Sequence, residues 1–518
     1  MSTGIKFSKD ARESLKRGVD LVANAVKESL GAEGRNVIIP ASNGGYMITK
    51  DGVSIARAIY PEDQFEAIGA SMIKEAATRT NGVAGDGTTT ATVIAQAIFE
   101  GGLKLIDEGF SSVEVKKGID EAAKDVVEQL KKMSEKVTKK NLKHVATISA
   151  NGDAELGEMI SKAFNKIGEH GTVLPATSDT AETYIELREG VVLDRGYTSR
   201  VFRTDTQRDL CKMDKPFVLL HRGKIEKGDK ITKLFDAVFS KSDGRILIIT
   251  DDIDPFVHSV IAQNIDSGAI RNKICVVTLP QILKIQHDLL NDLAILTGAK
   301  IVSAEKGTRI EPSNLGRIKS CVVSEHDTVI VGDANNLTNL VEEIKEKIKI
   351  TKNKFDKEEL QERLSRITGG VATIYIGAKS DSELAEKSDR VEDSINATRS
   401  ALEEGIVSGG GVTFCDIVNN LLSEKTVDSS KSFGAGYKLL LDSCTTPFTQ
   451  ILKNAGIVNL HTDMKAGEGI DVKTGERVIM KDVGIIDPTK VARCALENAA
   501  SVASTFLTTE AVVARQQQ

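Results

Sequence analysis

The sequence predicts a multidomain protein of the α and α/β classes, in which both ends of the chain build one helical domain around an inserted α/β domain. Three observations support this prediction. The 518 residues are enough for about three domains. The two ends of the chain carry apolar residues at helical spacing, whereas the middle alternates short β-rich runs with helical stretches. A helical pattern that resumes after an α/β insert indicates that its two pieces share one core.

The N-terminal part, to about Lys132, is expected to be mainly helical. Its first apolar helical pattern stops at Gly31, and glycine suits the C-terminal cap of a helix. The stretch "NVIIPASNGGYMIT" then predicts a β-hairpin that turns at Asn43–Gly44. Long helices are expected over residues 65–81 and 88–108, and a more polar, mixed stretch follows over residues 134–188.

The middle of the chain predicts a separate α/β domain with a partly parallel sheet, over about residues 190–371. Four short runs are rich in β-forming residues: "PFVLL", "RILIIT", "KICVVTL" and "KIVS". Helical stretches such as "ITKLFDAVF" and "HDLLNDLAIL" separate them. A charge-laced helical pair closes this domain, and the helical pattern returns after Gly369–Gly370.

Composition argues against nucleic acid and membrane partners. The net charge is −6 and there is no basic block, which disfavours nucleic-acid binding. No apolar run approaches the roughly 20 residues that span a bilayer, and the N-terminus lacks signal-peptide and transit-peptide features. The six scattered cysteines show no CxxC spacing, which favours buried free thiols in a reducing compartment over disulfides or a zinc site. A cytoplasmic location is therefore expected.

The stretch "AGDGTTTATV" combines a flexible acidic turn with a poor helix start. Three consecutive β-branched threonines, Thr88 to Thr90, are unfavourable on propensity alone. A phosphate would explain them, because a helix N-terminus offers unpaired N–H groups, glycines allow close approach and hydroxyls add donors. Asp86 suits a phosphate that carries magnesium. The alternative is an ordinary Asp or Thr helix cap.

Other segments support a phosphate site. "GAEGRNV" and "TKDGVS" are two more glycine-containing turns in the same domain, whereas GxxxxGK[ST] is absent, which excludes a P-loop. Asp389 and Asp393 lie at i, i+4 spacing, and a solvated acidic face is the favoured interpretation of Asp389.

Taken together, "GRNV", "TKDGVS", "AGDGTTTATV", "TISAN", "RVED…ATRSALEEGIVSGGGV" and "GIIDPTKVAR" resemble the group I chaperonins, the GroEL family, from about Ile5 to Val512. The resemblance implies a chaperonin-like fold with helical equatorial, small intermediate and α/β apical domains. The implied segments are equatorial 1–132, intermediate 133–189, apical 190–371, intermediate 372–403 and equatorial 404–518.

The resemblance also implies an ATP-dependent molecular chaperone, an ATP hydrolase with Mg²⁺ as cofactor. Asp393 matches the acid that orients the attacking water, Asp51 lies in a second catalytic loop and Asp86 matches the magnesium ligand. Hydrolysis would then need the intermediate domain to close, with Gly190, Gly370 and Gly405 as candidate hinges. The implied ATP-binding residues are Leu30, Gly31, Lys50, Gly52, Gly87, Thr88, Thr89, Thr90, Ser149, Gly410, Ile485 and Asp487.

The implied partners are unfolded polypeptides and identical subunits in a ring, seven-membered in the family. The need for a co-chaperonin lid is left open. Polypeptides would bind apolar side chains of the apical domain at Tyr197, Val201, Phe202 and Phe235. Other matching positions are less apolar, which suggests a more selective surface: Thr232, His258, Ala262 and Gln263.

The chain departs from the family at several points. Ala32 replaces the usual proline, and "GIDVK" (residues 469–473) replaces a Gly-aromatic-Asn/Asp-Ala run, which makes contacts to the base less certain than contacts to the phosphates. "LPQILKIQHD" stands in place of "PGFGDRR", and the Gly/Met-rich tail is missing.

Positions that match the contacts between two stacked rings also differ. They are Lys104, Glu108, Lys431, Thr449 and Val458. Two opposite-charge pairs of the family's double rings become one neutral pair and one like-charge pair in this chain. The attraction between rings that is lost is repeated at every subunit. The hypothesis is weakened stacking, which gives single rings or a nucleotide-dependent mixture. The alternative is that compensating contacts keep two rings.

Two other functions are considered. A chaperonin-fold binding scaffold with little ATP turnover is disfavoured because Asp51, Asp86 and Asp393 are retained. A metal-dependent hydrolase that uses the acids of "TDDIDP" is weak, because acids between a strand and a helix are usually caps.

Overall fold

The computed structural model describes most of the chain. The described ranges are 2–40, 45–167, 172–178, 180–189, 191–193, 195–206, 209–226, 231–240, 244–279, 283–303, 307–332, 337–351, 353, 356–357, 359–360, 363–364, 367, 370–457 and 464–516.

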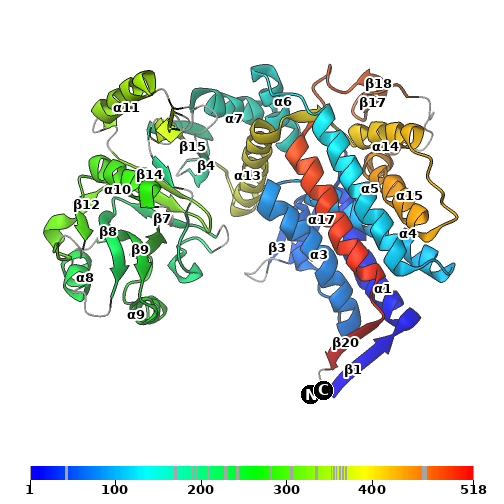
Figure 1. The fold of residues 1–518 in the computed structure, drawn as a ribbon, viewed down its shortest axis with the longest axis horizontal. Helices are drawn as coiled ribbons and strands as arrows, with labels where there is room; N and C mark the ends of the chain where they lie inside the picture. Colours follow the sequence, from blue (N-terminus) through cyan, green and yellow to red (C-terminus); the bar gives the residue numbers. More distant parts are fainter. Residues whose placement is uncertain are drawn as a thin grey trace. The chain divides into compact units, whose positions relative to one another are not determined.

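The chain forms two compact units (Figure 1). Unit 1 comprises residues 1–162, 175–184 and 375–518, and unit 2 comprises residues 163–174 and 185–374. Unit 1 is therefore discontinuous and unit 2 is inserted into it. The predicted fold class is confirmed, whereas the finer division into five segments stays a prediction.

Unit 1 is mainly helical. Its helices are α1 (Ser8–Val26), α2 (Gly52–Ala58), α3 (Gln64–Ala84), α4 (Thr88–Asp107), α5 (Ser112–Met133), α6 (Lys139–Ser149), α13 (Asp381–Glu404), α14 (Val412–Glu424), α15 (Ser432–Cys444), α16 (Thr446–Asn454) and α17 (Thr489–Leu507). The expected helices over residues 65–81 and 88–108 correspond to α3 and α4, and the Gly31 stop follows a short 3₁₀ turn after α1.

The described part of unit 1 contains four two-stranded antiparallel sheets. They pair β1 (Ser2–Phe7) with β20 (Ala511–Gln516), β2 (Val37–Pro40) with β3 (Tyr46–Thr49), β16 (Ile406–Ser408) with β19 (Ile486–Pro488), and β17 (Glu468–Asp471) with β18 (Glu476–Ile479). The predicted hairpin is confirmed as β2–β3, and its Asn43–Gly44 turn lies outside the described residues.

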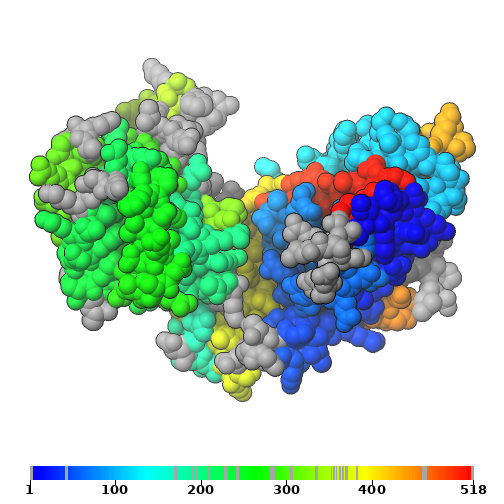
Figure 2. Space-filling model, turned by 90° about the horizontal axis from the view of Figure 1, so that it is seen from below, coloured from blue at the N-terminus to red at the C-terminus, as the bar shows by residue number. Residues whose placement is uncertain are grey.

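The two ends of the chain share one core in unit 1. Helix α17 packs along α3, α4 and α5 (Figure 1), and the Phe506 ring lies 4.8 Å from the Phe99 ring between their centroids. The terminal strands β1 and β20 pair in register from Ser2 with Gln516 to Phe7 with Ala511. Segments from the two ends, blue and red, adjoin on the face drawn in Figure 2. Packing of these buried apolar faces is what joins them.

Unit 2 contains the α/β sheet. Strands β10 (Ile274–Thr278), β9 (Ile246–Ile253), β8 (Phe217–Ile225) and β11 (Ile301–Ser303) run parallel in that order, and β12 (Gly316–Arg317) pairs antiparallel with β8. The central strands are buried nearly throughout, as expected for a parallel sheet with helices on its faces. The helices are α8 (Ile231–Phe239), α9 (Pro255–Asp266), α10 (Leu283–Thr297) and α11 (Thr338–Ile350).

A second, antiparallel sheet in unit 2 has the order β6 (Val191–Leu193), β14 (Thr328–Val331), β13 (Ser320–Val323) and β7 (Cys211–Asp214). The boundaries between the units fall within four elements: α7 (Ala154–Ile167), β4 (Thr172–Thr177), β5 (Tyr184–Glu189) and β15 (Gly370–Ile376). The three strands pair in the order β4, β15, β5.

The cysteines are free thiols. Five are buried and Cys415 is half-buried. In the described part of the chain, none of the helices combines the length and apolar character needed to cross a membrane.

Helices α1 and α3 approach each other closely near the start of α3. Helix α3 ends at the turn that carries Asp86. A methyl group added at Gly69 of α3 would come within 2.1 Å of the carbonyl oxygen of Leu15 in α1. Gly82, near the other end of α3, would meet nothing within 4 Å.

The change Gly69→Ala is therefore expected to lower stability by roughly 1–3 kcal/mol, because α1 and α3 must separate to admit the methyl group. The matched change Gly82→Ala, in the same helix, is expected to be neutral or stabilising by up to about 1 kcal/mol. Midpoints of thermal unfolding of the two variants check this. Equal midpoints would contradict the close packing.

Candidate functional site: an acidic cavity in unit 1

The turn between α3 and α4 presents an acid between two glycines. Gly85 ends α3 with φ of 69° and Gly87 begins α4 with φ of 84°, so both lie in the left-handed region that glycine favours. Asp86 accepts a hydrogen bond from the Gly87 N–H at 2.5 Å. No side chain caps α4, so the Asp or Thr cap considered for this helix is wrong. The N-terminal N–H groups of α4 remain available to a ligand.

A second turn meets the first. Asp51 caps α2 by accepting hydrogen bonds from the N–H groups of Val53 and Ser54, at 3.2 and 2.8 Å. A methyl group added at Gly52 would come within 2.5 Å of Thr89 Oγ1. The backbone of the β3–α2 turn therefore lies against the first turn of α4, and a side chain at residue 52 would displace the hydroxyls of Thr88 and Thr89.

Both turns line one cavity of about 480 Å³ within unit 1. It also receives the end of α6, the middle of α13, the glycines before α14 and the segment before α17. Every residue predicted for nucleotide, metal or catalysis lines it: Leu30, Gly31, Lys50, Asp51, Gly52, Asp86, Gly87, Thr88, Thr89, Thr90, Ser149, Asp393, Gly410, Ile485 and Asp487.

The cavity contains acids whose charges act on one another. Enclosure by the protein raises the pKa of Asp393 well above its usual range, and the charges of Asp86 and Asp51 raise it further. Enclosure also raises the pKa of Asp86, against the opposing hydrogen bonds from the Gly87 N–H and the Ser149 hydroxyl. The repulsion means that the site is short of positive charge, which a cation would supply.

The donor set fits Mg²⁺ with a phosphate rather than a metal held by protein alone. Among the described residues, no group of three or more His, Cys, Asp or Glu side chains could hold a metal ion. Magnesium in phosphate-binding sites is typically held by one or two carboxylates plus phosphate oxygens and water. Asp86, with its neighbour Asp51, matches that pattern.

The C-terminal part of the chain contributes another acid to the cavity, Asp487. Enclosure raises the pKa of Asp487 to about 7, the charge of Asp86 contributes, and a hydrogen bond from the Gly410 backbone opposes the shift. The Asn454 amide donates to the carbonyl oxygens of Lys27 and Leu30, both at 2.9 Å, which fixes the backbone before Gly31.

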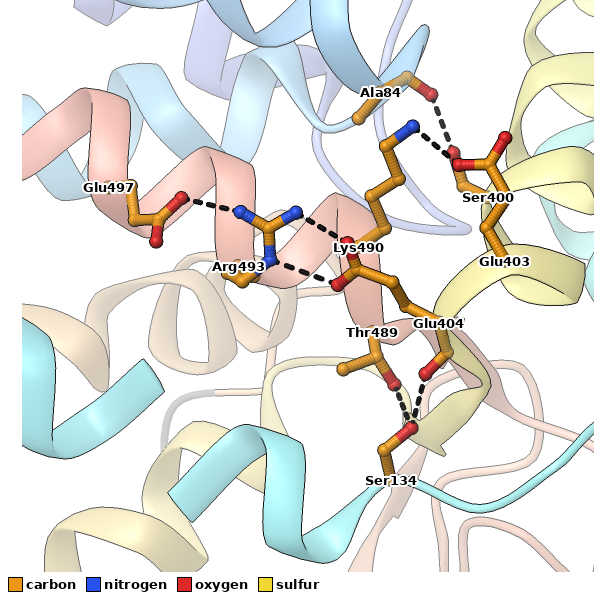
Figure 3. Close-up of polar contacts among 9 residues, drawn as sticks. All are labelled: Ala84, Ser134, Ser400, Glu403, Glu404, Thr489, Lys490, Arg493 and Glu497. Carbon is orange, nitrogen blue, oxygen red and sulfur yellow. Dashed lines mark hydrogen bonds and ion pairs between the residues drawn. The ribbon is translucent and has the colours of Figure 1, made fainter. Parts of the chain in front are cut away.

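Helix α13, which carries Asp393, is anchored where it meets α17 (Figure 3). Arg493 donates to both carboxylate oxygens of Glu404, at 2.9 and 2.5 Å, and lowers the pKa of that carboxyl. Lys490 pairs with Glu403 at 2.6 Å. The Ser400 hydroxyl donates to the carbonyl of Ala84, the residue before the phosphate turn, at 3.0 Å.

The end of α13 is also tied to the segment after α5. The Ser134 hydroxyl donates to the Glu404 carbonyl at 2.6 Å and lies 2.7 Å from the Thr489 hydroxyl (Figure 3). Gly405 has φ of 83°, and a methyl group there would come within 2.5 Å of the Glu135 carbonyl oxygen. Of the other candidate hinges, Gly370 begins β15 and Gly190 lies outside the described residues.

The cavity also contains residues that the sequence did not indicate. Asp389 is half-buried and lines the cavity, and its interpretation as a solvated acid stays a prediction. Its i, i+4 spacing to Asp393 was the available signal. Arg390 and Lys473 lie in the quoted stretches "RVED" and "GIDVK", but the sequence assigned neither of them a role. No sequence pattern singled out the others: His144, Glu386, Phe414 and Phe448.

The predicted polypeptide-binding residues lie in unit 2, and two of them are core residues. Tyr197 is 7% and Phe202 2% exposed, so neither offers apolar area to solvent and their assignment to an exposed binding surface needs correction. Both rings are buried because they pack into the core of unit 2. Val201 and Phe235 are half-buried against the same core. The exposed apolar side chains nearby are on α9: Phe256 is 53% and Val260 40% exposed.

The acids of "TDDIDP" have structural roles. Asp254 caps α9, Asp252 pairs with Lys224 at 3.5 Å, and Asp251 accepts hydrogen bonds from the Gly223 N–H and the Gln286 amide. The described residues therefore give no support to a metal-dependent hydrolase at this position.

Comparison with known proteins gives the same fold. The chain resembles the crystal structure of the chaperonin gp146 from bacteriophage EL of Pseudomonas aeruginosa, solved in the presence of ATP-BeFx. For crystal form II the TM-score is 0.73 at 22% identity, and for crystal form I it is 0.67 at 21% identity. In both cases 99% of each chain is covered. The sequence profile of the TCP-1/cpn60 chaperonin family matches residues 22–517, and the chain therefore belongs to the TCP-1/cpn60 chaperonin family.

Proposed function

We propose that this chaperonin hydrolyses ATP in the acidic cavity of unit 1 and uses the cycle to bind and release unfolded polypeptides. One observation carries the proposal. Acids and glycine turns from segments as far apart as residues 51, 86, 393 and 487 line one cavity. A relative with the same fold was crystallised in the presence of ATP-BeFx.

The chain supplies charge and position rather than covalent chemistry. The uncapped N-terminus of α4 and the hydroxyls of Thr88 to Thr90 bind the phosphates. Asp393 faces the same cavity and orients the attacking water. Asp86, with Asp51 beside it, would hold Mg²⁺, which supplies charge neutralisation when bound.

Helix α13 gates the reaction in this proposal. Asp393 is carried on α13, whereas the phosphate turn is carried on α3 and α4. The ion pair between Arg493 and Glu404 fixes the end of α13 against α17. A shift of α13 at this anchor would move Asp393 relative to the phosphates and switch hydrolysis on or off.

The alternative is a chaperonin-fold scaffold with little or no turnover. The raised pKa values of Asp86 and Asp393 disfavour it, because enclosed carboxylates that repel one another cost stability unless a ligand relieves them.

Replacement of Asp393 by Ala is expected to slow ATP hydrolysis by about 10²-fold or more, because the attacking water loses its orienting acid. Nucleotide binding should change little. Asp86→Ala should abolish magnesium-dependent turnover, because the phosphate charge loses its neutralising ion. Steady-state phosphate release and ATP binding by calorimetry measure both effects. Asp252→Ala, an exposed acid in unit 2, is the control. Turnover at the wild-type rate in both site variants would support the scaffold.

Assembly into a ring is proposed from two two-stranded sheets of unit 1 that carry exposed apolar side chains. Ile5, Phe7 and Val513 are exposed on β1–β20, and Ile38 and Tyr46 are exposed on β2–β3. Each two-stranded sheet leaves strand edges unpaired, and an isolated two-stranded sheet is only marginally stable. Because the two patches differ, pairing one with the other on a neighbour is a head-to-tail contact, which generates a ring when the rotation between subunits closes.

Ile38→Lys is expected to shift the particle from rings to smaller species, because a charge would replace apolar area at every subunit contact. Native mass measurement reads the subunit number directly. Ile479→Lys, at an exposed isoleucine of the separate β17–β18 sheet, is the matched control. An intact ring for Ile38→Lys would rule out this contact.

The same measurement addresses ring stacking, which stays a hypothesis. Glu108 and Thr449 are exposed, Lys431 pairs with Asp428 within the chain at 3.3 Å, and Val458 lies outside the described residues. A fourteen-subunit particle that persists with and without ATP and in high salt would refute weakened stacking.

Client capture is assigned to α9 of unit 2. Changing Phe256 and Val260 together to Ser is expected to weaken capture of a denatured model protein several-fold, because exposed apolar area is lost. Basal ATPase activity should not change. Ile295→Ser, at a similarly exposed residue on α10, is the control. Capture that equals the wild type in the double variant would place the binding surface elsewhere.

A further inference from the structure

The segment from Ile470 to Gly484 approaches α6 and the turn after it at two points. A methyl group added at Gly484 would come within 2.4 Å of His144 Nδ1, and one at Gly152 would come within 2.9 Å of Lys473 Nζ. All four of these residues line the acidic cavity. The approach of Gly484 to His144 is buried in the cavity wall. The approach of Lys473 to Gly152 lies at the cavity mouth, because Lys473 is exposed.

The turn after α6 offers a natural place for a cation. The carbonyl end of a helix carries partial negative charge, and α6 has no basic residue in its own last turn. Asn151 and Gly152 adopt φ of 57° and 85°, which turns the chain sharply at this helix end. Because Gly152 has no side chain, the ammonium of Lys473 can lie directly over the backbone of the turn.

Lys473 lies in the turn between β17 and β18, two strands that Figure 1 labels. Asp471 accepts a hydrogen bond from the Lys473 N–H at 3.0 Å through its side chain, and from the Gly475 N–H at 2.7 Å through its carbonyl. These bonds close the hairpin turn that carries residue 473. Lys473 is the last residue of the stretch "GIDVK", which departs from the usual pattern noted above.

We propose that Lys473 is a positioning residue that clasps the β17–β18 hairpin to the end of α6 across the cavity mouth and thereby slows nucleotide release. The inference rests on the proposed nucleotide binding. The same helix end carries Ser149, whose hydroxyl donates to Asp86 at 3.3 Å. Holding this end in place therefore keeps both the mouth and the metal side of the cavity closed around the ligand.

The clasp controls release rather than chemistry. Lys473 has no contact with Asp393, Asp51 or Asp86 among the interactions of the described residues. Its removal should speed dissociation of ADP and raise KM for ATP, and the rate of a single turnover should stay the same. A general loss of structure would also lower the rate of a single turnover. An unchanged single-turnover rate therefore separates loss of the clasp from loss of structure.

The test measures dissociation of radiolabelled ADP from the full-length particle by rapid filtration after a chase with unlabelled ADP. Lys473→Met keeps the length of the side chain and removes the charge. It is expected to accelerate release about tenfold, the size of one charge-assisted contact. Lys473→Arg should restore slow release. Gly152→Asn tolerates the left-handed backbone, displaces the ammonium and should also accelerate release.

Lys465→Met is the matched control, because Lys465 is an exposed lysine before the same hairpin and does not line the cavity. Release at the wild-type rate in both Lys473→Met and Gly152→Asn would overturn the clasp. Equal acceleration in Lys465→Met would also overturn it, because a general charge effect would then suffice. If the wild type retains no ADP, the proposed nucleotide site fails and the clasp fails with it.

Discussion

The packing of α17 against α3, α4 and α5 is the interaction on which the rest of unit 1 depends. It brings the end of the chain back onto its beginning, so that Asp487, just before α17, faces the turn that carries Asp86. Beyond its first turns, the face of α17 in this contact is mainly apolar and buried. Its first turns are polar, and there Lys490 and Arg493 pair with the end of α13. One helix therefore supplies both the core and the anchor of the candidate gate.

Charge explains why the cavity has the character of a ligand site rather than of a core defect. A folded chain gains nothing from enclosing Asp86 and Asp393, because burial, and then the charges of neighbouring acids, raise the pKa of both carboxyls. The uncapped start of α4 leaves donors without an intrahelical partner at the same place. The unpaired N–H groups complement a phosphate, and the neighbouring carboxylates complement a divalent cation. Each feature is unfavourable without a ligand, and together they form one binding site.

The sequence predicted local backbone structure well. Glycine at residues 85 and 87, the parallel strands of unit 2 and the β2–β3 hairpin follow from backbone preference and apolar patterning, and each is found in the structure. The cavity residues were found through short motifs, because phosphate turns need particular residues at fixed spacing. Burial was predicted less well. An aromatic residue such as Tyr197 or Phe202 has the same sequence signature whether it faces a client or the core, and only the packing of unit 2 distinguishes the two.

The contacts that sequence motifs miss are those made by backbone atoms and long side chains between distant segments. Lys473 and Gly152 lie over 300 positions apart in the sequence, and nothing local to either residue indicates the other. Gly152 allows the contact because it has no side chain, and Lys473 makes it because its side chain is long. Neither property depends on neighbouring residues, so neither produces a sequence motif. Such contacts can change without disturbing the phosphate turn. Divergent chaperonins can thus keep the chemistry of hydrolysis constant while the mouth of the cavity, and with it the lifetime of the bound nucleotide, is tuned separately.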